Sequence, residues 1–286
     1  MLKVLFGHQV VLRKEENIGP YEGLQIEVSK YEKLLKNNQN NLEKGLEDPK
    51  YDMNFQNGIL CTFDDGYKDN ITNALPIIEK YGVPCIVFIT TGFIESDLIP
   101  YEIELANIVK SLDMVETPDM GILPAIKKEE KEALYKKLRL PLKAKNNFKR
   151  QQYILNLLSL NSLSKDDVQK CDFLTWDDVS YLDKHPLVTI GAHSHTHPML
   201  NKISVSESYS EIKKSKDILE LRLKHRIDYF AYPYGAHSFI TRLLVKHIGF
   251  KYAFTTNSEV INDTARLNPF SIPRIDMNNY ELVMNE

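Results

Sequence analysis

The chain has 286 residues, enough for one large α/β domain or two small ones, and its 43% hydrophobic and 26% charged content is ordinary for a globular protein. A formal net charge of −3 excludes a general attraction to nucleic acid, and no apolar run approaches the length of a membrane span. Three widely spaced cysteines exclude a disulfide framework and a Cys-x-x-Cys metal site.

The first hundred residues alternate between strand-like and helical patterns. Residues 84–89 are hydrophobic throughout, as expected for a parallel strand that is buried on both faces. The pattern predicts strands at Leu2–Phe6, Gly58–Phe63 and Pro84–Ile89, a helix opened by the capping box Ser29-x-x-Glu32 with Tyr31, Leu34, Leu35 and Leu42 on one face, and a helix over 74–81 stopped by Gly82.

Residues 101–170 differ from the rest of the chain. They contain several helical patterns and no convincing strand, so we interpret them as a helical insertion of about 70 residues in one barrel domain that covers 1–286.

Strands and helices alternate again after this segment. We expect a helix that begins at Thr175 with Thr-x-x-Asp178, strands at 187–191, 228–231, 252–255 and 271–275, and helices at 205–224 and 238–248. Repeated β-then-α units predict a mainly parallel sheet, open or closed. In such folds the working residues gather at the carboxyl ends of the strands.

Two adjacent carboxylates, Asp64 and Asp65, follow the apolar strand at 58–63. Burying both charges is costly, and a nearby cation would lower that cost, with one acid holding the metal and the other moving a proton. An ordinary Asp-Asp-Gly turn is the alternative interpretation of these residues.

Three histidines lie within five residues after the strand at 187–191. A single helical turn would bring His193 and His197 to one side, where with one Asp they would form a two-histidine, one-carboxylate metal set. His195 would then point elsewhere. The alternative is a polar loop with surface histidines.

Other residues are expected near the same rim. His8 follows the first strand, and Pro233-Tyr234-Gly235 forms a rigid turn after another strand. Trp176, the only tryptophan, could line a sugar cleft or anchor its helix in the core. The basic run Lys127–Arg150 could meet a phosphate-bearing substrate or an anionic membrane face, or it could be a solvated helix face.

Taken together, these motifs resemble the polysaccharide deacetylase family, also called the NodB-homology domain or carbohydrate esterase family 4. Thr62-Phe63-Asp64-Asp65-Gly66 is similar to its first motif, and His193-Ser194-His195-Thr196-His197 is similar to its second. The resemblance covers roughly 1–94 and 172–276. His8 in Phe-Gly-His-Gln-Val resembles the opening of a permuted branch of the family that has an N-terminal catalytic histidine.

The resemblance implies a distorted (β/α)7 TIM-like barrel and a metal-dependent hydrolase that removes N-acetyl groups from an amino sugar or glycan. Asp65, His193 and His197 would bind one divalent metal, with Zn2+ the first choice and Co2+, Ni2+, Fe2+ or Mn2+ as alternatives. Asp64 would be the general base, His8 the acid, and a metal-bound water the nucleophile.

One family motif is incomplete. Ala231 stands where the third motif has an arginine that orients the base, although Pro233 and Tyr234 match it. We therefore expect Arg274 to supply this contact from the last strand, and we add it to the candidate catalytic group. Pro233, Tyr234 and Trp176 are the candidate substrate-binding residues, and a backbone N–H near Tyr234 is a candidate oxyanion donor.

The absence of signal-peptide features predicts a cytoplasmic protein, unless a leader has been removed. Its substrate would then be an N-acetylated sugar, a sugar nucleotide, a lipid-linked sugar or a glycan at the inner membrane face, with peripheral membrane contact and no nucleic-acid partner. Two alternative functions are compatible with these residues. One is a catalytically impaired, deacetylase-like glycan-binding protein, and the other is a non-haem iron oxygenase, which uses the same metal ligand set.

Overall fold

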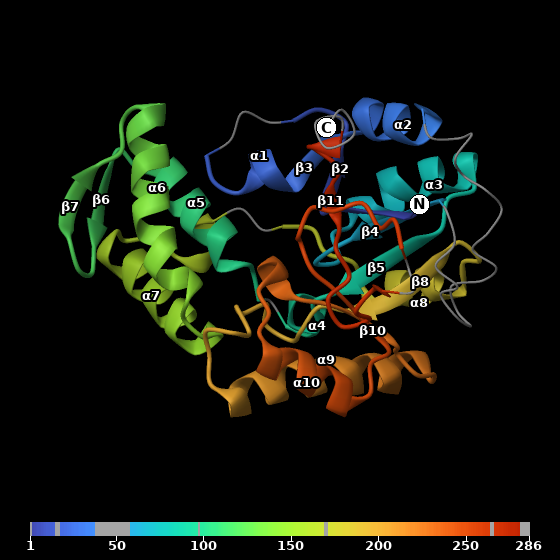
Figure 1. Cartoon of the computed structure of the whole chain (residues 1–286). Helices are drawn as coiled ribbons and strands as arrows, with labels where there is room; N and C mark the ends of the chain where they lie inside the picture. Colours follow the sequence, from blue (N-terminus) through green and yellow to red (C-terminus); the bar gives the residue numbers. More distant parts are fainter. Residues whose placement is uncertain are drawn as a thin grey trace.

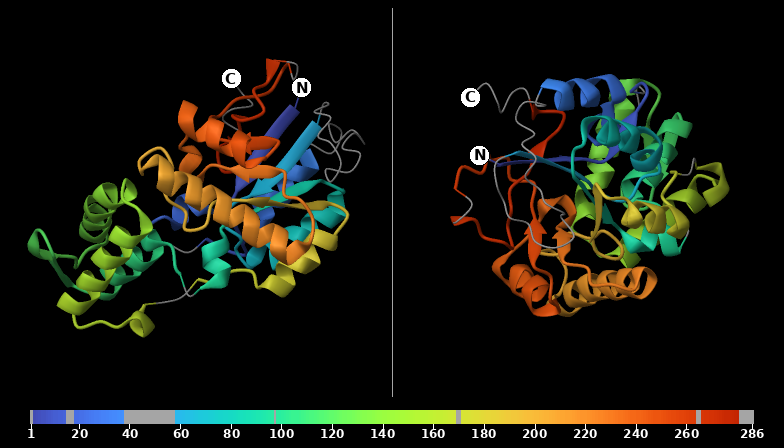
Figure 2. Two further views of the ribbon diagram at one scale, coloured as in Figure 1. Left: turned by 90° about the horizontal axis from the view of Figure 1, so that it is seen from below. Right: turned by 90° about the vertical axis from the view of Figure 1, so that its right-hand side faces the viewer.

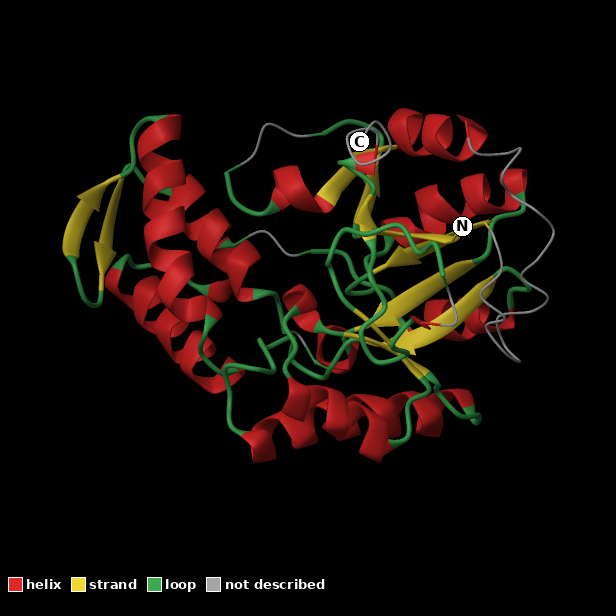
Figure 3. Ribbon diagram, in the orientation of Figure 1, coloured by secondary structure: helices red, strands yellow, loops and turns green. Residues whose placement is uncertain are grey.

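A computed structural model describes residues 2–14, 18–37, 58–96, 98–168, 171–263 and 266–280. The protein has an α/β fold built on a curled parallel sheet with helices packed around it (Figures 1 and 3). Within the described residues, no helix is both long enough and apolar enough to cross a membrane.

Seven of the described strands form the sheet, in the order β10-β9-β8-β5-β4-β1-β11, and every pairing in it is parallel. Their bounds are β1 (Leu2–Gly7), β4 (Gly58–Phe63), β5 (Cys85–Ile89), β8 (Val188–Ala192), β9 (Tyr229–Ala231), β10 (Tyr252–Phe254) and β11 (Ile275–Asp276). A parallel pair outside this sheet joins β2 (Gln9–Val11) to β3 (Gln25–Glu27).

Helices lie between successive strands and cover the sheet, with α9 and α10 along one side and α2 and α3 along another (Figures 1 and 2). The bounds in this part of the chain are α1 (Tyr21–Leu24), α2 (Val28–Asn37), α3 (Leu75–Tyr81), α4 (Thr91–Glu95), α8 (Trp176–Lys184), α9 (Val205–Leu223) and α10 (Phe239–Ile248). Short turns of π-helix at Asn70–Ala74 and of 3-10 helix at Lys165–Asp167 and Pro233–Gly235 complete the set.

The central strands are buried on both faces, and the continuous apolar run at 84–89 predicts this for β5. Every residue of β5 and of β8 is buried. The sheet is close to closing on itself, because Ile272, just before β11, pairs in parallel with Phe254 at the other edge. This arrangement is consistent with the distorted (β/α)7 barrel that the sequence predicts.

Helix caps account for most of the predicted helix boundaries. Thr175 caps α8 through a capping box with Asp178, as expected. Gly82 and Gly249 end α3 and α10 in the left-handed conformation, with φ of 63° and 97°. The predicted capping box at Ser29 is wrong, because β3 runs directly into α2 and places Ser29 inside the helix; Leu42 lies outside the described residues.

The segment that follows Pro100 forms a separate lobe that projects to one side of the sheet (Figure 2, left). It contains α5 (Tyr101–Ser111), α6 (Lys128–Lys143), α7 (Asn147–Leu160) and an antiparallel hairpin of β6 (Met114–Thr117) and β7 (Gly121–Pro124), with its own apolar core. The helices agree with the prediction, but the expectation of no strand is wrong. The strands have four residues each, and β7 is almost fully exposed, so no apolar alternation marks it in the sequence.

Candidate active site

The carboxyl ends of three strands bring the candidate residues together. His8 follows β1, Asp64 and Asp65 follow β4, and His193 follows β8. The Asp64 N–H donates to Gly7 O at 3.0 Å, and the His193 N–H donates to Ile89 O at 2.9 Å. Backbone hydrogen bonds therefore continue past the strand ends and hold these residues on one rim.

Asp65, His193 and His197 form a cluster in which one ligand atom from each residue lies within 4.8 Å of the others; Asp65 and His193 are buried and His197 is half-buried. Asp65 Oδ1 is 3.6 Å from His193 Nε2 and 3.4 Å from His197 Nε2. The same oxygen is buried and has no hydrogen-bond partner among the described residues. Two imidazole nitrogens facing an unsatisfied carboxylate oxygen fit a divalent cation of the zinc type.

The orientation of His193 supports this fit. Its Nδ1 lies 2.8 Å from Ala231 O, so Nδ1 carries the proton and the lone pair of Nε2 points toward Asp65. Burial lowers the pKa of His193 and of His197, which keeps both imidazoles in their neutral, metal-binding form. Burial, and then the charges of Asp64 and Glu102, hold the pKa of Asp65 well above its usual range. A cation would favour the ionised form of Asp65 instead.

The histidines meet through a loop, so the predicted helical turn is wrong. Ser194 and His197 both have left-handed backbones, with φ of 62° and 57°. Ser194 Oγ accepts the His197 N–H at 3.1 Å and closes the loop. His195 Nδ1 lies 2.9 Å from Thr91 Oγ1, which directs this third imidazole elsewhere, as expected.

Asp64 is buried and held by Arg274, the residue expected to replace the motif arginine. Arg274 Nη1 and Nη2 donate to the two carboxylate oxygens of Asp64 at 2.8 Å each. The guanidinium is fully buried and also donates to Thr62 Oγ1 and Thr255 O, both at 2.9 Å. Burial alone would raise the pKa of Asp64, but the charges of Arg274 and His193 outweigh it and hold this pKa well below its usual range.

His8 lies half-buried at the end of β1, with its carbonyl accepting from Asn70 Nδ2 at 2.7 Å. Burial lowers the pKa of His8 to about 4, although the charges of Asp64 and Asp276 oppose this shift. His8 is therefore neutral at neutral pH in the free protein.

Tyr234, in the turn after β9, lies against the cluster of Asp65, His193 and His197. Its ring centroid is 4.6 Å from that of His197, and its hydroxyl donates to Glu102 Oε1 at 2.5 Å. Its backbone is left-handed, with φ of 58°, and the buried Pro233 precedes it in the turn. The turn thus brings Tyr234 to His197, while its hydroxyl is engaged by α5.

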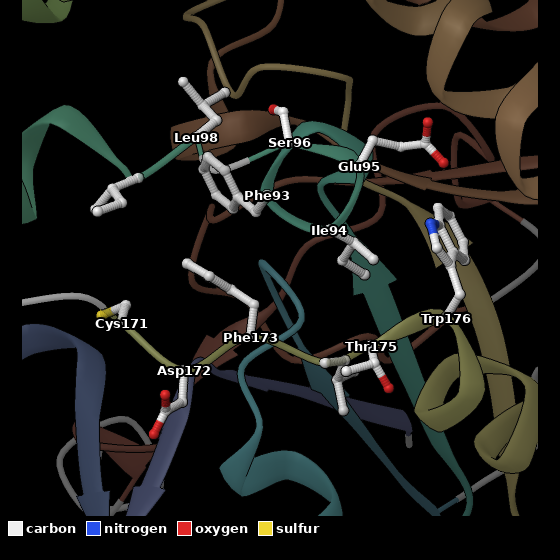
Figure 4. Close-up of a pocket in the computed structure, with 12 residues that line it drawn as sticks. Phe93, Ile94, Glu95, Ser96, Leu98, Cys171, Asp172, Phe173, Thr175 and Trp176 are labelled. Carbon is white, nitrogen blue, oxygen red and sulfur yellow. The ribbon is translucent and has the colours of Figure 1, made fainter.

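Trp176 lies outside this cluster, at the first position of α8. With Phe93 and Phe173 it lines a pocket of about 540 Å³ (Figure 4). The Phe93 ring lies 4.9 Å from Phe173 and 6.1 Å from His197, so it separates the pocket from the cluster. Trp176 also packs against the hydrophobic core that contains Phe63 and Val87, in agreement with the core-anchor interpretation, whereas the sugar-cleft interpretation stays a prediction.

Two site neighbours, Glu102 and Arg150, were not predicted from the sequence. Both are buried, and both contact rim residues from the helical segment. Arg150 belongs to the basic run that was interpreted as a solvated face or an anion site, and burial excludes the solvated interpretation for this residue. One feature of the sequence could have indicated that Arg150 is buried: it lies on the same face of α7 as the apolar residues Ile154, Leu157 and Leu158.

Comparisons with known proteins identify the family and the fold of this chain. The family model described as polysaccharide deacetylase matches residues 54–253. A search of curated proteins gave no match.

Three solved structures illustrate the shared fold. The Streptococcus pyogenes deacetylase PplD in complex with acetate has 15% identity and a TM-score of 0.59, over 99% of this chain and 97% of that chain. IcaB from Ammonifex degensii has 14% identity and a TM-score of 0.60, over 99% and 95%. The de-N-acetylase from Aggregatibacter actinomycetemcomitans has 16% identity and a TM-score of 0.57, over 99% of each chain.

Proposed function

Because the chain belongs to the polysaccharide deacetylase family, we propose that it is a metal-dependent hydrolase that removes N-acetyl groups from an amino sugar or glycan. One observation carries the proposal: the cluster of Asp65, His193 and His197 lies beside Asp64, which Arg274 holds through both carboxylate oxygens.

Asp65, His193 and His197 would hold one divalent cation, with Zn2+ the first choice for two nitrogens and one oxygen. When bound, such a cation lowers the pKa of water and polarises a carbonyl oxygen. Asp64, kept ionised by Arg274, takes the proton of the attacking water. The two adjacent acids thereby have different roles, because only Asp64 has a cationic side chain paired with its carboxylate.

His8 would protonate the departing amine, which is a poor leaving group without a proton. A neutral His8 must first receive that proton, and Asp64, whose charge raises the pKa of His8, is the nearby group that takes one from water. The backbone N–H of Tyr234 is the proposed donor to the developing oxyanion. Water supplies one oxygen and one proton of the acetic acid that is released, and its other proton, passed through His8, leaves on the amino sugar.

The position of His8 also supports membership of the branch with an N-terminal catalytic histidine. The family match begins at residue 54, whereas His8 reaches the rim from β1, which pairs with β4. We place the protein in this branch on that basis, as one barrel domain in which the segment 101–170 is an insertion at the rim.

The substrate class is an N-acetylated sugar, free or carried on a nucleotide, a lipid or a growing glycan. The pocket lined by Phe93, Phe173 and Trp176 is a candidate site for a neighbouring sugar unit, since aromatic faces stack on sugar rings. We propose action in the cytoplasm or at the inner membrane face.

The glycan-binding alternative rested on Ala231 in the arginine position of the third motif. The contact between Arg274 and Asp64 removes this support, because the base has an arginine partner from another strand. An iron oxygenase shares the ligand set, but the family match to polysaccharide deacetylases argues against it.

Metal analysis combined with acetate release from a panel of N-acetyl sugars and glycans tests the proposal. We expect about one equivalent of divalent metal, acetate release from at least one substrate, and none from the matched variant Asp64→Asn. Metal binding without acetate release across the panel would favour the glycan-binding alternative. Oxygen-dependent turnover with iron would favour the oxygenase.

A further inference from the structure

Arg150 in α7 is a buried cation whose hydrogen bonds all go to backbone carbonyls within the described residues. It is 2% exposed. Nε donates to Leu142 O at 3.1 Å, Nη2 to Lys143 O at 2.7 Å, and Nη1 to His197 O at 2.9 Å. Buried arginines ordinarily pair with a carboxylate, so this arrangement requires an explanation.

Two of these contacts explain how α6 and α7 are held together. Leu142 and Lys143 are the last residues of α6, where backbone carbonyls lack intrahelical donors. The Tyr101 ring, 4.5 Å from the guanidinium, adds a cation–π contact with α5. These contacts within the segment do not explain the third hydrogen bond of Arg150. That bond joins the helical segment to His197, one of the three proposed metal ligands.

The third contact fixes a strained residue. His197 has a left-handed backbone with φ of 57°, a conformation that is sterically unfavourable for a residue with a Cβ atom. Ser194 Oγ accepts the N–H of His197, and Arg150 donates to its carbonyl, so both sides of the residue are held. The direction of the imidazole toward Asp65 depends on this backbone conformation.

A second buried residue of the helical segment holds the other side of His197. Glu102 in α5 accepts the hydroxyl hydrogen of Tyr234, whose ring packs on the His197 imidazole. Glu102 is 6% exposed. Arg150 therefore acts on the backbone of His197, and Glu102 acts on its ring through Tyr234.

We infer that Arg150 and Glu102 are positioning residues for His197, so that the helical segment completes the metal site instead of only covering the rim. The inference rests on the metal site of the proposed function. By thermodynamic reciprocity, a bound metal must stabilise the docking of the segment as much as docking strengthens metal binding.

The test measures metal binding by the full-length protein, without any sugar substrate. Apoprotein of wild type, Arg150→Met, Arg150→Lys and Glu102→Gln is titrated with Zn2+ in competition with a chelating dye, and the visible spectrum of each Co2+ form is recorded. We expect Arg150→Met to weaken Zn2+ binding about 10–100-fold and to change the Co2+ spectrum, as loss of an orienting contact to a ligand does. Arg150→Lys retains one donor and should recover part of the affinity.

Lys149→Met is the matched control, because Lys149 is the neighbouring cation of α7 and is exposed. It should leave both readouts unchanged. Ser194→Ala, which removes the opposite contact to His197, should weaken Zn2+ binding as well, and it remains informative if Arg150→Met does not fold. Folded Arg150 variants with wild-type affinity and spectrum would overturn the inference, as would a wild type that binds no divalent metal.

The outcome is separable from that of the proposed function. Weakened metal binding in the variants of a protein that releases no acetate would leave the inference standing while the deacetylase proposal fails. Normal acetate release by the wild type, with unchanged metal binding in the variants, would support the deacetylase proposal and contradict the positioning role of Arg150 and Glu102.

Discussion

Replacing Arg274 by Met is the sharpest test of how Asp64, the proposed base, is held. The substitution keeps much of the side-chain volume and removes the cation that donates to both oxygens of Asp64. Asp64 is 2% exposed, so water cannot replace the lost hydrogen bonds without rearrangement. Thr62 Oγ1 and Thr255 O lose a donor as well.

The expected magnitude follows from burial. Removing one partner of a buried ion pair typically costs about 3–5 kcal/mol, because the remaining charge is left unpaired. For a chain of this size that loss lowers the melting temperature by roughly 6–20 °C. Turnover should fall strongly under conditions where the variant is still folded, since the base is no longer oriented.

Chemical denaturation measures the stability change, and a double-mutant cycle with Asp64→Asn isolates the pair. We expect Arg274→Met to cost at least about 2 kcal/mol less in the Asp64→Asn background than in wild type. Arg274→Lys is the control that keeps the charge and loses the bidentate contact with Asp64. Its losses of stability and of turnover should be intermediate. Unchanged turnover together with a stability loss below about 1 kcal/mol would refute the reasoning.

Three further predictions concern single side chains. Asp64→Asn should abolish acetate release while equilibrium dialysis still finds bound metal, and a variant with wild-type activity would rule out Asp64 as the base. His8→Gln should slow release from N-acetyl sugars about 10²–10⁴-fold yet leave hydrolysis of 4-nitrophenyl acetate nearly unchanged, because only the amine requires a proton to leave; equal losses on both substrates would contradict the acid assignment. Burial raises the pKa of Asp69 to about 7, so the native state binds this proton more tightly than the unfolded chain does. The resulting contribution to stability is present at acidic pH and is lost as pH rises from about 4 to about 7. Asp69→Asn should flatten the fall in unfolding free energy over that window by up to about 4 kcal/mol, and identical pH profiles for the two proteins would exclude the shift.

The sequence predicted the sheet well because its signals are local. Continuous apolar runs such as β5, and caps such as Thr175 and Gly82, report on burial and backbone conformation within a few residues. The hairpin β6–β7 and the start of α2 were mispredicted. The hairpin exposes most of its side chains, and α2 follows β3 without an intervening loop that a cap could occupy.

The site was predictable where motif residues follow strands. Asp65, His193 and His197 meet because parallel strands end at one rim, although the loop geometry that joins the two histidines does not follow from their spacing. Ala231 contributes through its carbonyl, which every residue type possesses, so no sequence signal marks it. Arg150 reaches His197 from 47 residues away, a contact that depends on tertiary packing.

The pairing of Asp64 with Arg274 has a consequence for the order in which the site is completed during synthesis. The two residues are 210 positions apart, and β11 follows Arg274 directly. A ribosome that has released β1, β4 and β8 has already delivered Asp65, His193 and His197, whereas Asp64 still lacks its counter-charge. The three proposed metal ligands are therefore all present on the nascent chain before Asp64, the proposed base, can acquire its counter-charge from Arg274.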